Sequence, residues 1–165
     1  MILAFAHPGI VVPNLEKAID FYRRMFGFEV ISHESWEKPS PDYDQGIGLK
    51  NSAAKGCLMK GHNCYLELFE FTSPSQRFEG PDKLGAHEPG IRHIAFYVDD
   101  ARAEYQRLLK LGGQILGQPV GSDNNGYVVY ARDPFGNIIE LSEIPCPEES
   151  PDTLPGISSL GNYQG

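Results

Sequence analysis

Two histidines and two glutamates occupy matching places in the chain. His7 opens the segment HPGIVVPNLEKAIDFYRRMFGFEV, and His93 opens HIAFYVDDARAEYQRLLKLGGQIL, which aligns with it without a gap. Glu67 stands in CYLELFEF and Glu140 in NIIELSEI, and these two segments also correspond. Imidazole nitrogens and carboxylate oxygens are common ligands of divalent transition metals. If the two halves of the chain pair, the sequence predicts that these side chains converge on one metal ion.

Each of these residues alone has a more ordinary interpretation. A histidine in a strand is more often a hydrogen-bonded core or edge residue than a ligand, and a strand glutamate commonly faces water. The joint pattern favours a metal, because two carboxylates and two imidazoles buried together are costly without a cation. This mixture of nitrogen and oxygen donors suits Zn, Ni, Co, Mn or Fe(II), and donor type alone does not choose among them.

The elements that must position these residues also repeat. Each half has the pattern of a strand, a helix and three further strands, with alternating apolar positions in the strands and helical spacing between them. The polar pairs Pro13-Asn14 and Asp99-Asp100 are suited to begin the helices, and Gly27 and Gly112 are suited to end them. The sequence therefore predicts an α+β fold made of two βαβββ modules.

Composition divides the chain around these modules. Polar, turn-rich stretches interrupt the first half and separate it from the second, and Pro and Gly are frequent at the end. The predicted parts are a first module at 1–71 with an insertion at about 35–53, a linker at 72–90, a second module at 91–144 and a tail at 145–165.

The charge and the cysteines exclude several classes of protein. The formal net charge of −8 argues against nucleic acid and against an anionic membrane surface as partners. Cys57, Cys64 and Cys146 have no regular spacing, so they predict neither a disulfide framework nor a zinc cluster. The apolar N-terminal stretch lacks a basic region and is too short to span a membrane. These features together predict a cytoplasmic protein with reduced thiols.

The chain resembles the vicinal oxygen chelate superfamily, which includes glyoxalase I, methylmalonyl-CoA epimerase, extradiol dioxygenases and the fosfomycin and bleomycin resistance proteins. The motifs that carry the resemblance are HPGIVVPNLEKAIDFYRRMFGFEV, YLELFE, RHIAFYVDD and RDPFGNIIEL. The resemblance implies that the modules form an open eight-stranded mixed-sheet trough with the helices outside. It also implies a homodimer and one divalent metal, whose ligands here are His7, Glu67, His93 and Glu140.

The chemistry implied by the resemblance is chelation of a small-molecule substrate through neighbouring oxygens, with the metal acting as a Lewis acid. We expect an isomerase or epimerase that removes a proton next to the chelated carbonyl. Glu140 is the first candidate for the base and Glu67 the second. A second base on the opposite side is not evident, because Glu70 alternates away from Glu67 and the remaining candidates lie in the insertion, namely Asp42 and Asp44.

Four other functions stay open at this point. A glyoxalase I-like lactoylglutathione lyase is favoured by Glu67, although no clear set of arginines for glutathione is evident. An extradiol-type dioxygenase is disfavoured, because four protein ligands leave too little room for oxygen and catechol. A fosfomycin-type thiol transferase is mildly disfavoured by Glu67. A metal-free binding or resistance protein is disfavoured by the presence of all four ligand residues.

Aromatic residues near the four ligands are predicted to line the substrate pocket, although such residues often belong to a core. Among them, the tryptophan of the insertion is a candidate lid residue. The set is Trp36, Tyr65, Phe69, Tyr97, Tyr127 and Tyr130. Three cations are interpreted as surface charge rather than as an anion site, namely Lys50, Lys60 and Arg132.

Overall fold

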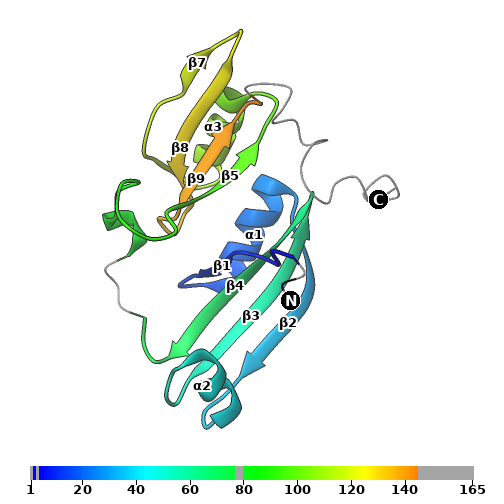
Figure 1. Cartoon of the computed structure of the whole chain (residues 1–165), viewed down its shortest axis with the longest axis vertical. Helices are drawn as coiled ribbons and strands as arrows, with labels where there is room; N and C mark the ends of the chain where they lie inside the picture. Colours follow the sequence, from blue (N-terminus) through cyan, green and yellow to red (C-terminus); the bar gives the residue numbers. More distant parts are fainter. Residues whose placement is uncertain (1, 3, 77–79, 145–165) are drawn as a thin grey trace. The chain divides into compact units, whose positions relative to one another are not determined.

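The computed structural model describes residues 2, 4–76 and 80–144, and the chain divides into two units, Met1–Glu79 and Gly80–Gly165 (Figure 1). The predicted tail at 145–165 lies outside the described residues. Each unit contains a mixed sheet with a helix packed on one face, so the predicted α+β class is confirmed.

Unit 1 carries the first module, with a short helix between its second and third strands. Its sheet has the order β1-β4-β3-β2, in which β1 runs parallel to β4 and the other pairs are antiparallel. The elements are β1 (Gly9–Val11), α1 (Leu15–Phe26), β2 (Glu29–Trp36), α2 (Pro41–Ile47), β3 (Ala53–Gly61) and β4 (Cys64–Ser73).

Unit 2 carries the second module, and the order of its sheet, β5-β9-β8-β6, repeats that of unit 1. The additional strand β7 pairs with β8 in the part of the module where unit 1 has α2. The two predicted βαβββ modules are therefore confirmed. The elements are η1 (Pro81–Lys83), β5 (His93–Tyr97), α3 (Ala101–Lys110), β6 (Gln114–Ile115), β7 (Val120–Ser122), β8 (Gly126–Arg132) and β9 (Ile138–Ser142).

The helices begin where the sequence predicts. The side chain of Asn14 accepts a hydrogen bond from the backbone N–H of Lys17 at 2.9 Å, and that of Asp100 accepts from the first turn of α3. α1 ends at Gly27, whose φ of 69° is the left-handed conformation expected there. The buried stripe of α1 packs against β3 and β4, where Leu68 is fully buried. None of the helices in the described residues is long and apolar enough to cross a membrane.

Candidate functional site

In each unit a histidine at or just before the first strand forms a close pair with a glutamate of the last strand. In unit 1 the Nε2 atom of His7 lies 3.3 Å from Oε2 of Glu67. In unit 2 Nε2 of His93 lies 3.1 Å from Oε2 of Glu140. All four side chains are partly exposed, so the pairs are accessible to a small ligand.

The register of the sheets shows that the two pairs are built in the same way. Glu67 pairs with Gly9 across the parallel β1–β4 ladder, and Glu140 pairs with Ala95 across β5–β9. In both units the histidine lies two residues before the residue that pairs with the glutamate. His93 is the first residue of β5, whereas His7 precedes the first residue of β1 by two positions. The internal repeat inferred from the sequence therefore extends to the geometry of the pairs.

The separation of the donor atoms fits a shared divalent cation. Ligand bonds of about 2.1 Å place two donors about 3.0 Å apart at a right angle and about 3.4 Å apart at a tetrahedral angle. The two measured separations, 3.3 and 3.1 Å, lie within this range. Among the described residues, no group of three or more His, Cys, Asp or Glu side chains could hold a metal. Within each unit, two candidate donors, one imidazole nitrogen and one carboxylate oxygen, lie close together.

The neighbours of the two carboxylates differ. Tyr130 of β8 is the register partner of Glu140, and its ring centroid lies 4.9 Å from that of His93. Burial raises the pKa of the Tyr130 hydroxyl, and its hydrogen bond to Glu140 raises that pKa further. The register partner of Glu67 is Leu58, which offers no hydroxyl. Of the two carboxylates, only Glu140 is therefore held by a tyrosine from its register partner.

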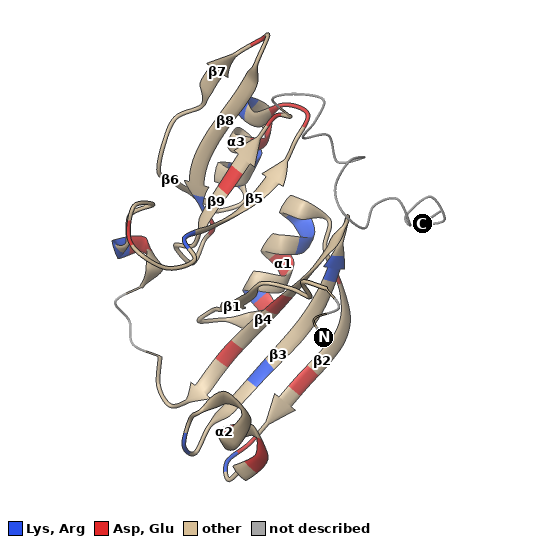
Figure 2. Ribbon diagram, viewed as in Figure 1, with Lys and Arg blue, Asp and Glu red and all other residues tan. Residues whose placement is uncertain are grey.

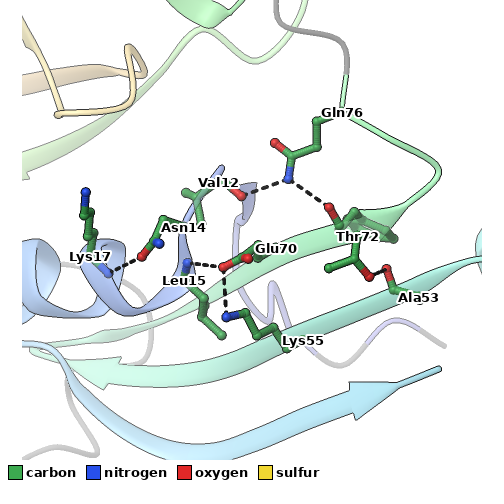
Figure 3. A network of polar contacts seen from close by, with 10 residues as sticks. Val12, Asn14, Leu15, Lys17, Ala53, Lys55, Glu70, Thr72 and Gln76 are labelled. Atoms are coloured by element: carbon green, nitrogen blue, oxygen red, sulfur yellow. Dashed lines mark hydrogen bonds and ion pairs between the residues drawn. The ribbon is translucent and has the colours of Figure 1, made fainter.

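A second glutamate three residues further along ties each last strand to the helix of its unit, and Figure 3 shows the contacts of this glutamate in unit 1. Oε2 of Glu70 accepts a hydrogen bond from the backbone N–H of Leu15 at 2.6 Å and lies 3.2 Å from Nζ of Lys55. In unit 2 the Glu143 carboxylate accepts from the backbone N–H of Ala101 at 2.9 Å and from a strand amide. Glu70 thus faces α1, as alternation predicts, and its carboxylate is hydrogen-bonded to the N-terminus of that helix. The shared E-x-x-E spacing was the sequence signal for this role.

Trp36 is a buried packing residue rather than an open substrate contact. Its side chain is 7% exposed, and its Nε1–H donates to Oγ of Ser52 at 2.9 Å. Its ring stacks on Tyr43 of α2, with centroids 4.3 Å apart and planes 4° apart, and meets Phe69 and Phe71 edge-on. Phe69 lies two residues after the ligand candidate of β4, on the same face of the strand. The insertion therefore closes one end of that face with an aromatic cluster.

The other predicted aromatic residues divide between the two faces of their sheets. Tyr65 lies two residues before Glu67 on the same face and is 40% exposed. Tyr97 shares a face of β5 with His93 and is 39% exposed. Tyr127 lies three residues before Tyr130 and therefore points to the opposite face, where its ring lies 4.0 Å from the Arg102 guanidinium. The structure does not bring Tyr127 together with Glu140.

Two charged residues considered from the sequence have structural roles. Arg132 is buried and donates hydrogen bonds to the backbone oxygens of Pro81, Leu84 and Gly136, which corrects its interpretation as surface charge. Asp44 accepts from the backbone N–H groups of Asn51 and Ser52 and from the Ser52 hydroxyl. These hydrogen bonds, that of the Ser52 hydroxyl foremost, lower the pKa of Asp44. Asp44 is therefore an anchor of the insertion rather than a free base.

Sequence reasoning missed Glu34 of β2. Glu34 pairs with Gly56, which pairs with Phe69, so Glu34 lies on the sheet face that carries Glu67. Figure 2 shows acidic positions on both β2 and β4. A β-bulge between Val30 and Ser32 moves the following residues of β2 to this face. Plain alternation assigns Glu34 to the opposite face, so the sequence contained no signal for its position.

Comparisons with known proteins agree with this architecture. The family model described as Glyoxalase/Bleomycin resistance protein/Dioxygenase superfamily matches residues 4–141. The chain is 30% identical to a 2-epi-5-epi-valiolone epimerase of Actinomyces sp. over 156 residues, which cover 87% of this chain and 81% of the relative. It is 26% identical to a lactoylglutathione lyase of Neisseria meningitidis over 143 residues, 82% of this chain and 86% of the relative. A crystal structure of a glyoxalase family protein from Bacillus cereus superposes with a TM-score of 0.76 at 23% identity, covering 87% of this chain and 95% of that one.

Proposed function

This chain belongs to the Glyoxalase/Bleomycin resistance protein/Dioxygenase superfamily, and on that premise we propose that it is a divalent-metal-dependent isomerase or epimerase of a small oxygenated substrate. The observation that carries the proposal is the repetition of one His–Glu pair, with separations of 3.3 and 3.1 Å, at equivalent positions of the two modules. The similarity to an epimerase over 87% of the chain supports the reaction class.

We propose that His7, Glu67, His93 and Glu140 together hold one metal ion, which is Zn, Ni, Co, Mn or Fe(II). The proposal requires that two modules, from one chain or from two copies in a homodimer, bring their pairs together in an open eight-stranded trough. When bound, the metal supplies a Lewis acid that polarises a carbonyl and makes the neighbouring C–H bond acidic.

In this proposal Glu140 removes the proton from the carbon next to the carbonyl. The Tyr130 hydroxyl holds the Glu140 carboxylate by a hydrogen bond, which fixes its orientation. Glu67, the equivalent carboxylate of unit 1, is the second candidate for the base. In an epimerisation a proton returns to the same carbon from the other side, so no co-reactant is consumed.

A glyoxalase-type lyase is the second candidate function. The similarity to a lactoylglutathione lyase favours it, and Glu67 stands where the family resemblance expects a ligand of glyoxalase I. The two candidates share proton transfer next to a chelated carbonyl and differ in the substrate.

The proposal is tested by metal analysis and by proton exchange. We expect protein purified without added metal to retain or bind one divalent ion per site, and to exchange the α-proton of 2-epi-5-epi-valiolone with solvent deuterium. The hemithioacetal of methylglyoxal and glutathione is the parallel substrate for the lyase. His7→Ala and His93→Ala should each weaken metal binding, whereas His87→Ala, whose side chain is 85% exposed outside both pairs, should not. Protein that binds none of the five metals contradicts the proposal.

A further inference from the structure

The face of unit 1 that carries Glu67 ends in a polar pair outside the candidate metal centre. Oη of Tyr43 donates a hydrogen bond to Oε1 of Glu34 at 2.9 Å, and both side chains are exposed. This hydrogen bond is the largest contribution that raises the pKa of Tyr43, so its hydroxyl stays protonated at neutral pH. The carboxylate retains acceptor capacity for further hydrogen bonds.

The pair is held in place by the aromatic cluster. The Tyr43 ring stacks on Trp36 at 4.3 Å, and Trp36 is fixed by its hydrogen bond to Ser52. Asp44, next to Tyr43 in α2, binds the two residues that lead into β3. These contacts orient the Tyr43 hydroxyl and Glu34 without any ligand, so the ordering cost of binding there is small.

The position of the pair sets the size of molecule that reaches it. Glu34 and Glu67 are separated by two strand spacings and by two residues along the strands, which places their Cα atoms roughly 12 Å apart. Phe69 lies between them on β4, and its ring covers Gly56, where an added Cβ would lie 2.5 Å from the ring. A small ring that touches the metal ligand at one edge therefore crosses an apolar surface before it meets Glu34.

The charge of the pair selects the chemistry of the occupant. A carboxylate repels the phosphates and carboxylates of large anionic carriers, and it accepts hydrogen bonds from hydroxyl groups. Strand β3 carries two cations. Lys55 is paired with Glu70 on the α1 side of the sheet, and Lys60 lies on the Glu67 face but at the register of Tyr65, four residues along β3 from Gly56, the partner of Glu34. A ring placed over Phe69 would present a CH face to that side chain and hydroxyls to Glu34 and Tyr43.

We infer that Glu34 and Tyr43 are a specificity-determining pair that binds a distal hydroxyl of the substrate, and that the substrate is a small polyhydroxylated cyclic ketone. This inference rests on the proposed function, because it assumes that the carbonyl end of the substrate is held beside Glu67. It adds a recognition site about one ring away from the metal ligands and names the class of molecule that fits between them.

Two ligands with the same arrangement of chelating oxygens distinguish the recognition pair from the proposed function. A pentahydroxycyclohexanone and 2-hydroxycyclohexanone both carry a ketone next to a hydroxyl, and only the first has distal hydroxyls. We expect the Zn-loaded full chain to bind the pentahydroxy ketone at least about tenfold more tightly in a calorimetric titration. Glu34→Gln should lower that affinity by about tenfold, and Tyr43→Phe by a smaller factor. Both variants should leave the affinity for 2-hydroxycyclohexanone and for Zn unchanged.

The controls keep folding and metal binding separate from recognition. Glu37→Gln removes a nearby exposed carboxylate and should change neither ligand affinity. Binding of 2-hydroxycyclohexanone with no preference for the polyol, or equal losses for both ligands in Glu34→Gln, overturns the recognition pair alone. Failure of both ligands to bind the Zn-loaded protein overturns the proposed function, and the recognition pair with it.

Discussion

Unit 1 and unit 2 share a His–Glu pair and differ in the residues that surround it. Both have a histidine two residues before the register partner of the glutamate, and both have a second glutamate that caps the helix. In unit 1 the Glu67 face leads to an aromatic cluster and to the Glu34–Tyr43 pair. In unit 2 the Glu140 carboxylate is held by a tyrosine hydroxyl. The repeat thus supplies one His–Glu pair in each unit. Under the proposed function, the differences favour a division of roles in which unit 1 recognises the substrate and unit 2 moves the proton.

The last strands of the two units, β4 and β9, are covered by packed residues at opposite ends. In unit 1 Trp36 packs on Phe69 and Phe71, which follow Glu67. In unit 2 Arg132 donates hydrogen bonds to the backbone oxygens of residues 81 and 84. Its register partner on β9 is Ile138, which lies two residues before Glu140 and is 4% exposed. If the substrate lies beside Glu67 and Glu140 as proposed, the aromatic cluster limits its extension along β4 after Glu67. The segment held by Arg132 limits its extension along β9 before Glu140.

The largest expected effect tests the division of labour directly. Glu140→Gln removes the proposed base, so we expect turnover at saturating metal to fall by about 10²–10⁴-fold. Glu67→Gln removes a ligand without a tyrosine partner, so we expect its main effect to be weaker metal binding, by at least about tenfold. The measurements are α-proton exchange at saturating metal and a metal competition titration. Equal losses of turnover in both variants would show that the two carboxylates share the proton transfer.

The next prediction tests how rigidly the aromatic cluster of unit 1 is packed. Gly56→Ala places a methyl group 2.5 Å from Cδ1 of Phe69, so the ring must move. We expect the free energy of unfolding to fall by about 1–3 kcal/mol in a urea titration. The matched control is Gly46→Ala in α2, where a Cβ has open space and should stabilise by about 0.5–1 kcal/mol. Unchanged stability in Gly56→Ala would show that the cluster yields easily and is a poor wall for a ligand.

The sequence predicted the equivalence of the two His–Glu pairs because each of the signals behind it is local. Strand alternation, the helix caps at Asn14 and Asp100 and the terminal Gly27 each depend on a few neighbouring residues, and the structure has all of them. Because the two repeats align without a gap, His7 and His93 occupy equivalent positions, and each lies two residues before the register partner of the glutamate in its sheet.

The surroundings of the centre were not predictable to the same degree. Glu34 reaches the Glu67 face only because of a bulge in β2, and a single inserted residue reverses the faces of a strand. The burial of Arg132 depends on carbonyls some 50 residues earlier, with which no sequence pattern associates it. Tyr127 is a different case, because its spacing of three from Tyr130 already indicated opposite faces of one strand.

The smallest expected effect is a pH dependence confined to unit 1. Hydrogen bonds lower the pKa of Asp44 below its usual value of 3.8, so the stability they supply is present above about pH 3.8 and is lost as the pH falls through the lowered pKa. The segment that closes unit 2 is held by hydrogen bonds from Arg132 to backbone oxygens rather than to a carboxylate. Acid should therefore loosen α2 first, and the fluorescence of the single tryptophan, Trp36, reports that change because its ring stacks on α2. Asp44→Asn should show the same fluorescence change already at neutral pH, while Asp42→Asn, an exposed neighbour, should match the unmodified chain. If Asp44→Asn also matches it, the anchor of the insertion lies elsewhere, and the rigidity attributed to the Glu34–Tyr43 pair loses its basis.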